Sequence, residues 1–414
     1  MKQIKLFLPL LLAPFLSSCL GDEPNNIAYV TAIGIDRADV GYLYTIQFAQ
    51  PTKISGGSEE SGGSTGDIVD NIAVEAPTLY SAINIADTII SKDLSLSHAK
   101  VFVIAEEIAR GGLGEINDTI ARNNDIRPDI YISITDKAGE YLDEVKPSIE
   151  LNPVKYYQLT YENKNGSAIP QNNARDFYSA CVSGTKDALL PLAGIAEAAD
   201  ESAEDRSEEQ KSIENTKQND ANINTGGFDN GTRNYFAGET GKKIKNKSEV
   251  LGAAVFKGDR LIGKIGSTET ELHNILMNHF MTMNLSFYSD DGQITLKVSE
   301  KNFPKYVVDK DNKTADIYLV LQCELLSVPD KHPSNLADVE KAVSETVNIG
   351  AEQFAEKMYR ELNADVLGIK GRLRSKFLTL AGYEKYCAAF DPAEWNIYVH
   401  SDIEIRRTGM TYYE

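Results

Sequence analysis

Apolar side chains along this chain recur with two periods, which predict two kinds of element. A period of two appears in GYLYTIQFAQ (residues 41–50), and the preceding IAYVTAIGID (residues 27–36) is apolar on both faces, so both are predicted strands joined by a turn. The pattern then predicts strands over residues 98–105 and 130–134, and two helices marked by Leu79, Ile83, Ala86 and Ile90 and by Ile108, Leu113, Ile116 and Ile120. Strands separated by helices predict a mixed sheet with helices on one or both faces.

The second half of the chain has a different order of elements. It opens with two short strands in LGAAVFKGDRLIGKI (residues 251–265), and a helix over residues 269–280 follows. Three strands come next, near residues 285–288, 294–298 and 317–326, and then a long helix with the apolar stripe Leu336, Val339, Val343, Val347, Phe354, Met358 and Leu362. The last strand, residues 395–406, alternates strictly, which predicts an antiparallel sheet with one solvated face. The predicted class is α+β, with several domains of mixed and antiparallel sheets packed by helices.

An acidic segment, residues 197–247, separates the two halves. Between residues 197 and 220 it has nine acidic and three basic side chains, and Ile213 is its only large apolar side chain. Burial in such a segment cannot offset the entropy lost on ordering, so we expect a disordered linker. The linker divides the chain into an N-terminal α+β region at 27–196, with two subdomains, and a C-terminal α+β domain at 248–414.

The first 18 residues have the parts of a secretory signal peptide. Lys2 and Lys5 form a positive start, and the apolar core Leu6–Phe15 follows. This core is shorter than the roughly 20 residues that a transmembrane helix needs. We therefore expect residues 1–18 to be removed, and residues 19–26 to form a short polar tether.

A cysteine stands directly after this signal. The sequence Leu16-Ser17-Ser18-Cys19 resembles the lipobox of bacterial lipoproteins. The resemblance implies that Cys19 becomes the new N-terminus and carries N-palmitoyl and S-diacylglycerol groups. Two or three acyl chains hold a protein on a membrane far better than one. An ordinary signal peptide with an incidental cysteine is the alternative.

The net charge of the chain limits the partners that it can meet. It is −19, and removal of residues 1–18 with their two lysines makes the remainder more negative still. Such a chain has no electrostatic footprint for nucleic acid. An anionic membrane surface repels it as well, so the lipid must hold it and partners must be met through specific contacts.

The three remaining cysteines do not form a disulfide framework or a metal motif. Cys181, Cys323 and Cys387 are odd in number and widely spaced, and the chain has no C-x-x-C pair. We interpret all three as buried small hydrophobic side chains.

The chain has few motifs that resemble catalytic ones, and they lack the flanking elements that catalysis requires. Gly62-Gly63-Ser64-Thr65-Gly66 matches G-x-S-x-G, but it lies in a Gly/Ser-rich loop instead of between a strand and a helix, as a hydrolase requires. His273 and His279 are six residues apart, on different faces of the predicted helix, and we interpret them as surface or packing groups instead of metal ligands. We therefore predict no catalytic residue, no metal site and no cofactor. The chain is not expected to be an enzyme.

Several segments together resemble one family. In chain order they are VTAIGIDRADVGYLYTIQFAQP, LSLSHAKVFVIAEEIARGGLGEINDTIARNNDIRPDIYISIT, NNARDFYSACVSGTKDALLPL, GAAVFKGDRLIGKI and DIEIRRTG. With the lipobox, they make the chain similar to the GerC-type lipoproteins, the C subunits of nutrient germinant receptors in endospore-forming bacteria. One departure is the turn Leu367-Gly368-Ile369-Lys370-Gly371, which is one residue looser than the glycine-alternating turn usual in the family.

The resemblance implies a three-domain α+β protein that is lipid-anchored on the outer face of the spore inner membrane. Its partners would be two integral membrane proteins, the A and B subunits, of which the B subunit resembles an amino-acid transporter. The chain would be a non-catalytic subunit needed for receptor assembly or signalling in germination. The alternatives are an extracytoplasmic solute-binding lipoprotein and, less in keeping with the motifs, an extracytoplasmic hydrolase.

Overall fold

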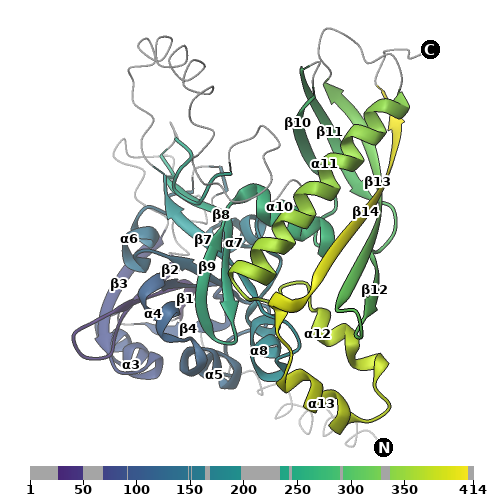
Figure 1. Ribbon diagram of the computed structural model, residues 1–414. Helices are drawn as coiled ribbons and strands as arrows, with labels where there is room; N and C mark the ends of the chain where they lie inside the picture. Colours follow the sequence, from purple (N-terminus) through teal and green to yellow (C-terminus); the bar gives the residue numbers. More distant parts are fainter. Residues whose placement is uncertain are drawn as a thin grey trace, which may run out of the picture.

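The strands of the protein form two sheets that stand side by side in a computed structural model (Figure 1). The structure describes residues 27–49, 69–90, 92–147, 149–150, 152–163, 168–196, 234–241, 245–289, 292–327 and 336–408. Within these ranges the first sheet has nine strands and the second has five. The α+β class with mixed sheets and packed helices, as predicted, is confirmed.

The first sheet is parallel in its middle and antiparallel at both sides. Its path is β3-β2-β1-β5-β6-β7-β8-β9, and β4 pairs with the start of β1. Neighbours β1, β5, β6 and β7 run parallel, because helical crossovers connect β5 to β6 and β6 to β7. The strands are β1 Ile27–Arg37, β2 Tyr42–Ala49, β3 Val69–Ala76, β4 Asp93–Ser95, β5 Val101–Ala105, β6 Tyr131–Thr135, β7 Leu189–Ile195, β8 Ser248–Lys257 and β9 Arg260–Ile265.

Helices cover both faces of this sheet. One face packs against α3 (Leu79–Ile89), α4 (Glu106–Gly111), α5 (Gly114–Arg122) and α8 (Ala174–Ser183), and a 3-10 turn at Leu96–His98 joins that core. The other face packs against α6 (Ala138–Asp143) and α7 (Pro153–Tyr161) around buried tyrosines. The sheet therefore separates two hydrophobic cores.

The helix that we expected from Ile108 to Ile120 is two helices, α4 and α5. The chain bends between them at Gly112, whose φ of 116° suits glycine only. The bend is held from outside, since Leu113 N donates to Asp259 O at 2.9 Å and Gly114 N donates to the Asp259 carboxylate at 3.1 Å. Helical spacing alone could not show a partner that lies so far along the chain.

The hairpin β8–β9 belongs to the first sheet, although we expected it to open the second half at residue 248. Antiparallel β7 and β8 pair from Leu189↔Val255 to Ile195↔Ser248. Along β8, Ala254 and Phe256 enter the core under the first sheet, while Ala253 and Val255 enter the core that continues to the second sheet. The predicted boundary therefore falls at the start of a strand that both cores share.

Part of the expected linker is also packed. Residues 234–240 lie against the first sheet, where Ala237 N donates to Leu251 O at 3.1 Å and Tyr235 O accepts from Ser267 N at 2.8 Å. Phe236 and Ala237 pack against the hydrophobic core. These two apolar side chains stand in a polar sequence, which is why composition did not reveal them. Residues 197–233 lie outside the described residues.

The second sheet has β11 and β12 beside one edge of β13, and β14 beside the other. Helix α11 lies across one face of it (Figure 1). The strands are β10 Met283–Ser289, β11 Gly292–Glu300, β12 Lys305–Asp309, β13 Thr314–Ser327 and β14 Asn396–Arg407. The helices are α10 Ser267–Met277, α11 Leu336–Glu356 with a π-helical turn Lys357–Glu361, α12 Ile369–Arg372, a 3-10 turn Leu373–Lys376, α13 Leu380–Ala388 and a 3-10 turn Pro392–Glu394.

The last strand runs parallel to β13, whereas we expected an antiparallel neighbour. The register extends from Thr314↔Asn396 to Glu324↔Arg407. The alternation itself is present, since Ile397, Val399 and Ile403 are buried. Alternation reports that one face of a strand is buried, and it carries no information about the direction of the neighbouring strand.

Candidate functional site at the junction of the two sheets

The residues predicted for lipid attachment, Leu16, Ser17, Ser18 and Cys19, lie outside the described residues, and their role stays a prediction. The G-x-S-x-G stretch at residues 62–66 lies outside them too. In the part of the chain that the structure describes, no helix is both long and apolar enough to span a bilayer.

The cysteines differ in burial. Cys323 is buried on β13, and burial raises the pKa of its thiol to about 12. Cys181 and Cys387 are only half-buried, so the prediction of three buried cysteines is correct for Cys323 alone. Across the described ranges, no group of three His, Cys, Asp or Glu side chains is arranged to hold a metal ion.

The two histidines come together, contrary to their expected places on different faces of one helix. Helix α10 ends at Met277, and Asn278 takes a left-handed conformation with φ 55° that turns the chain back. The ring of His279 then meets that of His273 edge-on, with 5.9 Å between centroids. His273 also contacts Phe354, and burial lowers its pKa to about 3. These are packing contacts, as interpreted.

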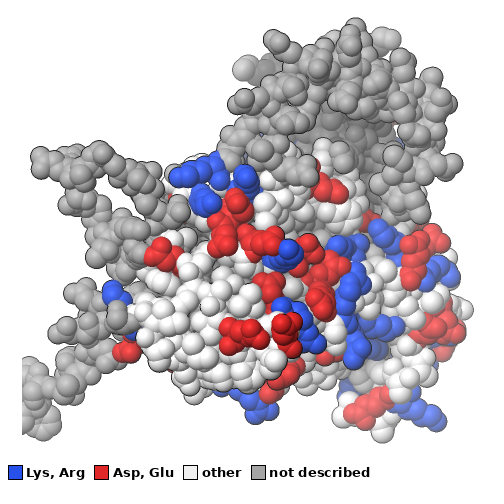
Figure 2. Space-filling view, turned by 90° about the vertical axis from the view of Figure 1, so that its left-hand side faces the viewer, with Lys and Arg blue, Asp and Glu red and all other residues white. Residues whose placement is uncertain are grey.

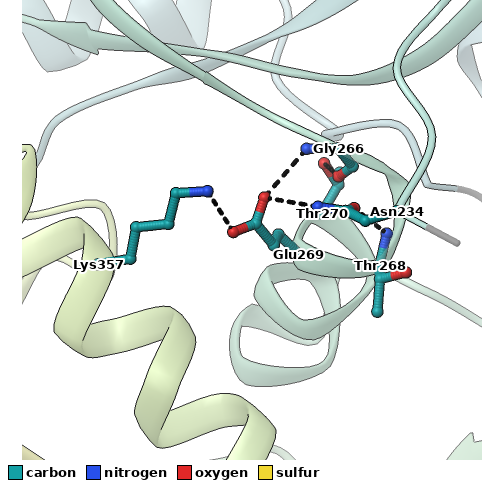
Figure 3. A network of polar contacts seen from close by, with 6 residues as sticks. All are labelled: Asn234, Gly266, Thr268, Glu269, Thr270 and Lys357. Carbon is teal, nitrogen blue, oxygen red and sulfur yellow. Dashed lines mark hydrogen bonds and ion pairs between the residues drawn. The ribbon is translucent and has the colours of Figure 1, made fainter. Parts of the chain in front are cut away.

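An ion pair with a buried carboxylate joins the two sheets (Figure 3). Glu269, on the first turn of α10, is 1% exposed, and one of its oxygens accepts from Lys357 Nζ at 2.6 Å. The other accepts from Gly266 N at 3.1 Å and from Asn234 Nδ2 at 3.0 Å. Because Lys357 lies directly after α11, this pair ties the helix of the second sheet to the end of β9. A buried charge is tolerated when it is paired and hydrogen-bonded in this way.

A second buried carboxylate, that of Asp365, lies on the same junction. Its oxygens accept hydrogen bonds from Tyr359 Oη and from the amides of Ile369 and Lys370, both at 2.8 Å. Burial raises the pKa of this carboxyl, and the three donors oppose the rise. The main chain of Asp365 also exchanges bonds with Asp187, just before β7: its amide donates to the Asp187 carboxylate at 2.8 Å, and its carbonyl accepts from Asp187 N at 2.9 Å.

The loop around Asp365 makes further contacts with the first sheet. Lys257 Nζ donates to Asn363 O at 2.8 Å, and Gly371 N donates to Thr185 O at 3.0 Å. A Cβ at Gly371 would lie 3.2 Å from both the carbonyl oxygen and the Cβ of Thr185, so glycine permits the close approach. The turn at residues 367–371, noted as unusual in the sequence, is therefore where the C-terminal part docks on the N-terminal part.

Sequence reasoning did not single out Glu269 or Asp365. A signal exists for Glu269, because a carboxylate three residues into a helix can accept from the amide of the N-cap residue, and Glu269 does so with Gly266 N. Asp365 stands in the apolar run Ala364 to Ile369, where a charged residue needs a buried partner. Neither signal names the partner.

A crevice of about 740 Å³ lies at the carboxyl ends of β6 and β7. Ligands of α/β proteins commonly bind at this end of parallel strands. The charged side chains that line it include Glu106, which pairs with Lys264 at 2.8 Å, and Lys137, which pairs with Glu140 at 2.6 Å. The crevice is large enough for a small polar molecule or for one side chain of a partner.

The outer surface offers contact areas of another kind. The side of the molecule that carries α3 and β3 includes a broad area without charged side chains (Figure 2). Val40, Tyr80 and Ile89 are 74%, 51% and 62% exposed on elements of this side.

Comparison with known families accounts for both halves of the fold. Residues 22–195 match the family "Spore germination protein N-terminal domain", and residues 251–409 match "Spore germination B3/GerAC like, C-terminal". Together the two matches cover most of the chain.

The chain belongs to the GerC-type family of spore germination proteins.

Individual GerC-type relatives are more distant. A putative spore germination protein YfkR of Bacillus subtilis is 28% identical over 151 residues, which are 36% of this chain and 38% of the relative. Spore germination protein KC of the same organism is 23% identical over 174 residues, 41% of this chain and 43% of the relative. GerQC of Bacillus cereus is 30% identical over 103 residues, 25% and 29% of the two chains. The chain thus spans less than half the length of these curated relatives.

One solved structure is similar over a longer stretch. The crystal structure of the GerBC protein matches with a TM-score of 0.49 and 13% identity, covering 90% of this chain and 96% of that one. On the fold described here, the N-terminal GerC-type match ends with β7 and the C-terminal match begins inside β8. The boundary between the two family domains therefore falls between two strands, β7 and β8, that are hydrogen-bonded to each other.

Proposed function

We propose that this protein is a non-catalytic, lipid-anchored subunit of a nutrient germinant receptor, needed for receptor assembly or signalling. The observation that carries the proposal is the match of both halves, in order, to the GerC-type domains. The partners are the membrane-embedded A and B subunits, and the place is the outer face of the spore inner membrane.

Two physical features support this role. The lipobox ending at Cys19 supplies an anchor, which a chain of net charge −19 needs because its overall charge opposes binding to an anionic bilayer. The buried Glu269–Lys357 pair and the Asp187–Asp365 contacts tie the two sheets together. Such a body can hold two partners at a set spacing, which suits a subunit that works through its surfaces.

Deletion of the gene tests the proposal. Spores without the protein should lose their response to the nutrient of this receptor, and they should still germinate with a stimulus that bypasses receptors. Normal responses to every nutrient in a strain without a paralogue would contradict the receptor role.

The anchor has a separate test. Cys19→Ala should give an unprocessed precursor or a soluble protein without lipid, because the only predicted acceptor thiol is gone. Labelled palmitate followed by membrane fractionation measures this, with Cys387→Ala as the matched control that keeps its label. Palmitate retained on the Cys19→Ala protein would show that the anchor is elsewhere.

The crevice favours the second candidate, a solute-binding lipoprotein. Titration calorimetry of the purified chain with the nutrients that trigger the spores distinguishes the two. Heat of binding that disappears with Lys264→Met would support capture of solute in this crevice. Absence of heat with every nutrient would leave the subunit role as the one supported.

A further inference from the structure

The segment from α12 to α13, residues 369–386, has the opposite charge to the rest of the protein. Five cations stand there against one carboxylate, Glu384, in a chain whose net charge is −19. Four of the five are exposed and the first is half-buried; they are Lys370, Arg372, Arg374, Lys376 and Lys385.

Exposed leucines lie in the middle of these cations. Leu378 is 105% exposed and Leu380 is 54% exposed, in the connection between the 3-10 turn Leu373–Lys376 and α13. Leu378 is therefore as accessible as in an extended chain. The two leucines follow Arg374 and Lys376 within six residues.

Leu378 and Leu380 form an apolar tip, and buried or partly buried side chains beneath them fix its position. Leu373 is buried, and Phe377 contacts Tyr383 and Tyr386 with ring centroids 5.9 and 5.2 Å apart. Tyr383 Oη donates to Lys370 O at 3.2 Å. Thr379 caps α13 by accepting from Gly382 N at 3.1 Å. The leucines are thus presented by a built element.

Aromatic rings are partners of several cations in this segment: Arg374 lies over Tyr383 at 5.6 Å from the centroid, and Lys370 lies over Phe390 at 5.8 Å. Within the described residues, none of its five cations lies within ion-pair distance of a carboxylate. Nearby Asp311 and Glu394 already pair with Lys310 and Lys313. Arg372 instead stacks over the ring of Tyr306, with its guanidinium carbon 3.4 Å from the centroid.

We propose that residues 369–386 form a second membrane contact, which lies on an anionic phospholipid surface. Leu378 and Leu380 enter the boundary between headgroups and acyl chains, and Arg374 and Lys376 meet the lipid phosphates. Cations around an apolar tip match the layered chemistry of that interface, in which apolar groups go deeper and charges stay at the headgroups. We call residues 369–386 the basic apolar segment.

This contact would give the anchored protein an orientation. This inference rests on the proposed function in one respect, which is that the lipid anchor places the chain beside a bilayer. The eight residues of the tether, 19–26, span at most roughly 27 Å, so the anchor limits how far the body can move away but leaves its rotation open. In Figure 1, α12 and α13 lie at the lower end of the second sheet, opposite the labelled ends of β10 and β11, so binding there would leave those ends and the first sheet open to partners.

The test uses the chain without its lipid, residues 19–414 carrying Cys19→Ser, and sedimentation with vesicles. We expect at least about tenfold stronger partition to vesicles of equal parts phosphatidylglycerol and phosphatidylcholine than to phosphatidylcholine alone, because each cation near an anionic surface adds to binding. High salt should weaken the binding. Equal partition to both vesicles, or to neither, would overturn the proposal.

Two double variants locate the contact. Arg374→Glu with Lys376→Glu, and Leu378→Ser with Leu380→Ser, should each reduce partition to the anionic vesicles at least about tenfold. Arg122→Glu with Arg127→Glu changes the net charge equally at cations that are 76% and 60% exposed on the first part of the molecule, and it should retain most of the binding. Equal losses in the control would mean that binding follows net charge and not this segment. Thermal unfolding of each variant verifies that it folds.

The outcome is separable from the receptor role. In spores, a protein with intact Cys19 stays on the membrane by its lipid even when the basic apolar segment is changed. One combination of results would show that the segment contacts a protein and that the membrane assignment is wrong. In it, the parent chain does not bind vesicles, and the Arg374→Glu, Lys376→Glu variant no longer co-purifies with an A or B subunit. The receptor proposal would then stand.

Discussion

Two buried carboxylates, those of Glu269 and Asp365, connect the two sheets at their junction. Glu269 is compensated by a full opposite charge, whereas Asp365 is compensated by a tyrosine hydroxyl and two amides of its own loop. Removing one member of a buried ion pair costs more than the pair itself contributes, because the remaining charge stays buried. The two sites should therefore differ in how they respond to substitution.

Lys357→Met should destabilise the protein by about 2–4 kcal/mol, because Glu269 keeps its burial and loses its cation. Adding Glu269→Gln should recover much of this loss, since the amide needs no counter-charge. Urea unfolding measures both. Lys341→Ala is the matched control, because its pair with Glu345 is 75% and 64% exposed and should contribute less than about 0.5 kcal/mol. A loss for Lys357→Met as small as that of the control would show that Glu269 is compensated by other groups.

His273 should make the protein sensitive to mild acid. Its folded pKa of about 3 lies below the ordinary 6.5, so the neutral ring stabilises the fold fully above pH 6.5, and the stabilisation is lost as the pH falls toward 3. Each unit of this difference corresponds to about 1.4 kcal/mol. Thermal unfolding between pH 7 and pH 4 should therefore be less pH-dependent in His273→Gln than in the parent. Identical pH slopes in the two proteins would contradict the assignment.

At the scale of the elements, helix α11 covers the outer edge of strand β14. Glu340, Ser344, Asn348 and Glu352 recur every four residues and so share one face of α11. Three of them accept from amides on the outer edge of β14: Glu352 from Val399 N at 3.0 Å, Asn348 from Ser401 N at 2.8 Å and Glu340 from Ile405 N at 2.8 Å. A free strand edge invites pairing with another chain, and this row of side chains occupies it.

Replacing Glu340, Asn348 and Glu352 together by alanine should open that edge. We expect a loss of stability of about 1 kcal/mol for each hydrogen bond removed, and new self-association through β14. Sedimentation velocity measures the association, and urea unfolding measures the stability. Lys341→Ala with Glu345→Ala, on an exposed part of the same helix, should leave both unchanged. A monomeric triple variant would mean that the helix, and not its polar row, protects the edge.

At the scale of the whole molecule, strand β8 ties the two halves together. Its alternate residues enter two different cores, and it pairs with β7 from before the acidic segment. We therefore expect a cut in the chain between β7 and β8 to leave the sheet and both cores intact. The pairing of β7 with β8 should not depend on the covalent connection between them.

Limited proteolysis of the soluble part should cut first within residues 197–233, whose composition predicts disorder. The two fragments should separate under denaturing conditions and elute together under native conditions, because β7 and β8 stay paired. Native fragments that separate would contradict the shared sheet. First cuts between residues 27 and 135 would mean that the acidic segment is not the most accessible part.

The amino-acid pattern by itself determined the elements and the family. Strands β1, β5, β6 and β13 and helices α3, α10 and α11 lie close to where the periods of apolar residues place them, because burial on one face leaves a local trace in the sequence. The order of specific segments determined membership of the GerC-type family. The proposal that Cys19 is a lipid anchor also rests on local sequence alone, because a lipobox is a linear motif.

Only the tertiary structure decided how these elements meet. It placed β8 and β9 in the first sheet, made β14 parallel, brought His279 back to His273 and split a helix at Gly112. It also paired Glu269 with Lys357, 88 residues away in the chain. The physical reason is the same in each case. Periodicity records that a side chain is buried, whereas strand direction, sheet membership and ion pairing depend on contacts between residues far apart in sequence.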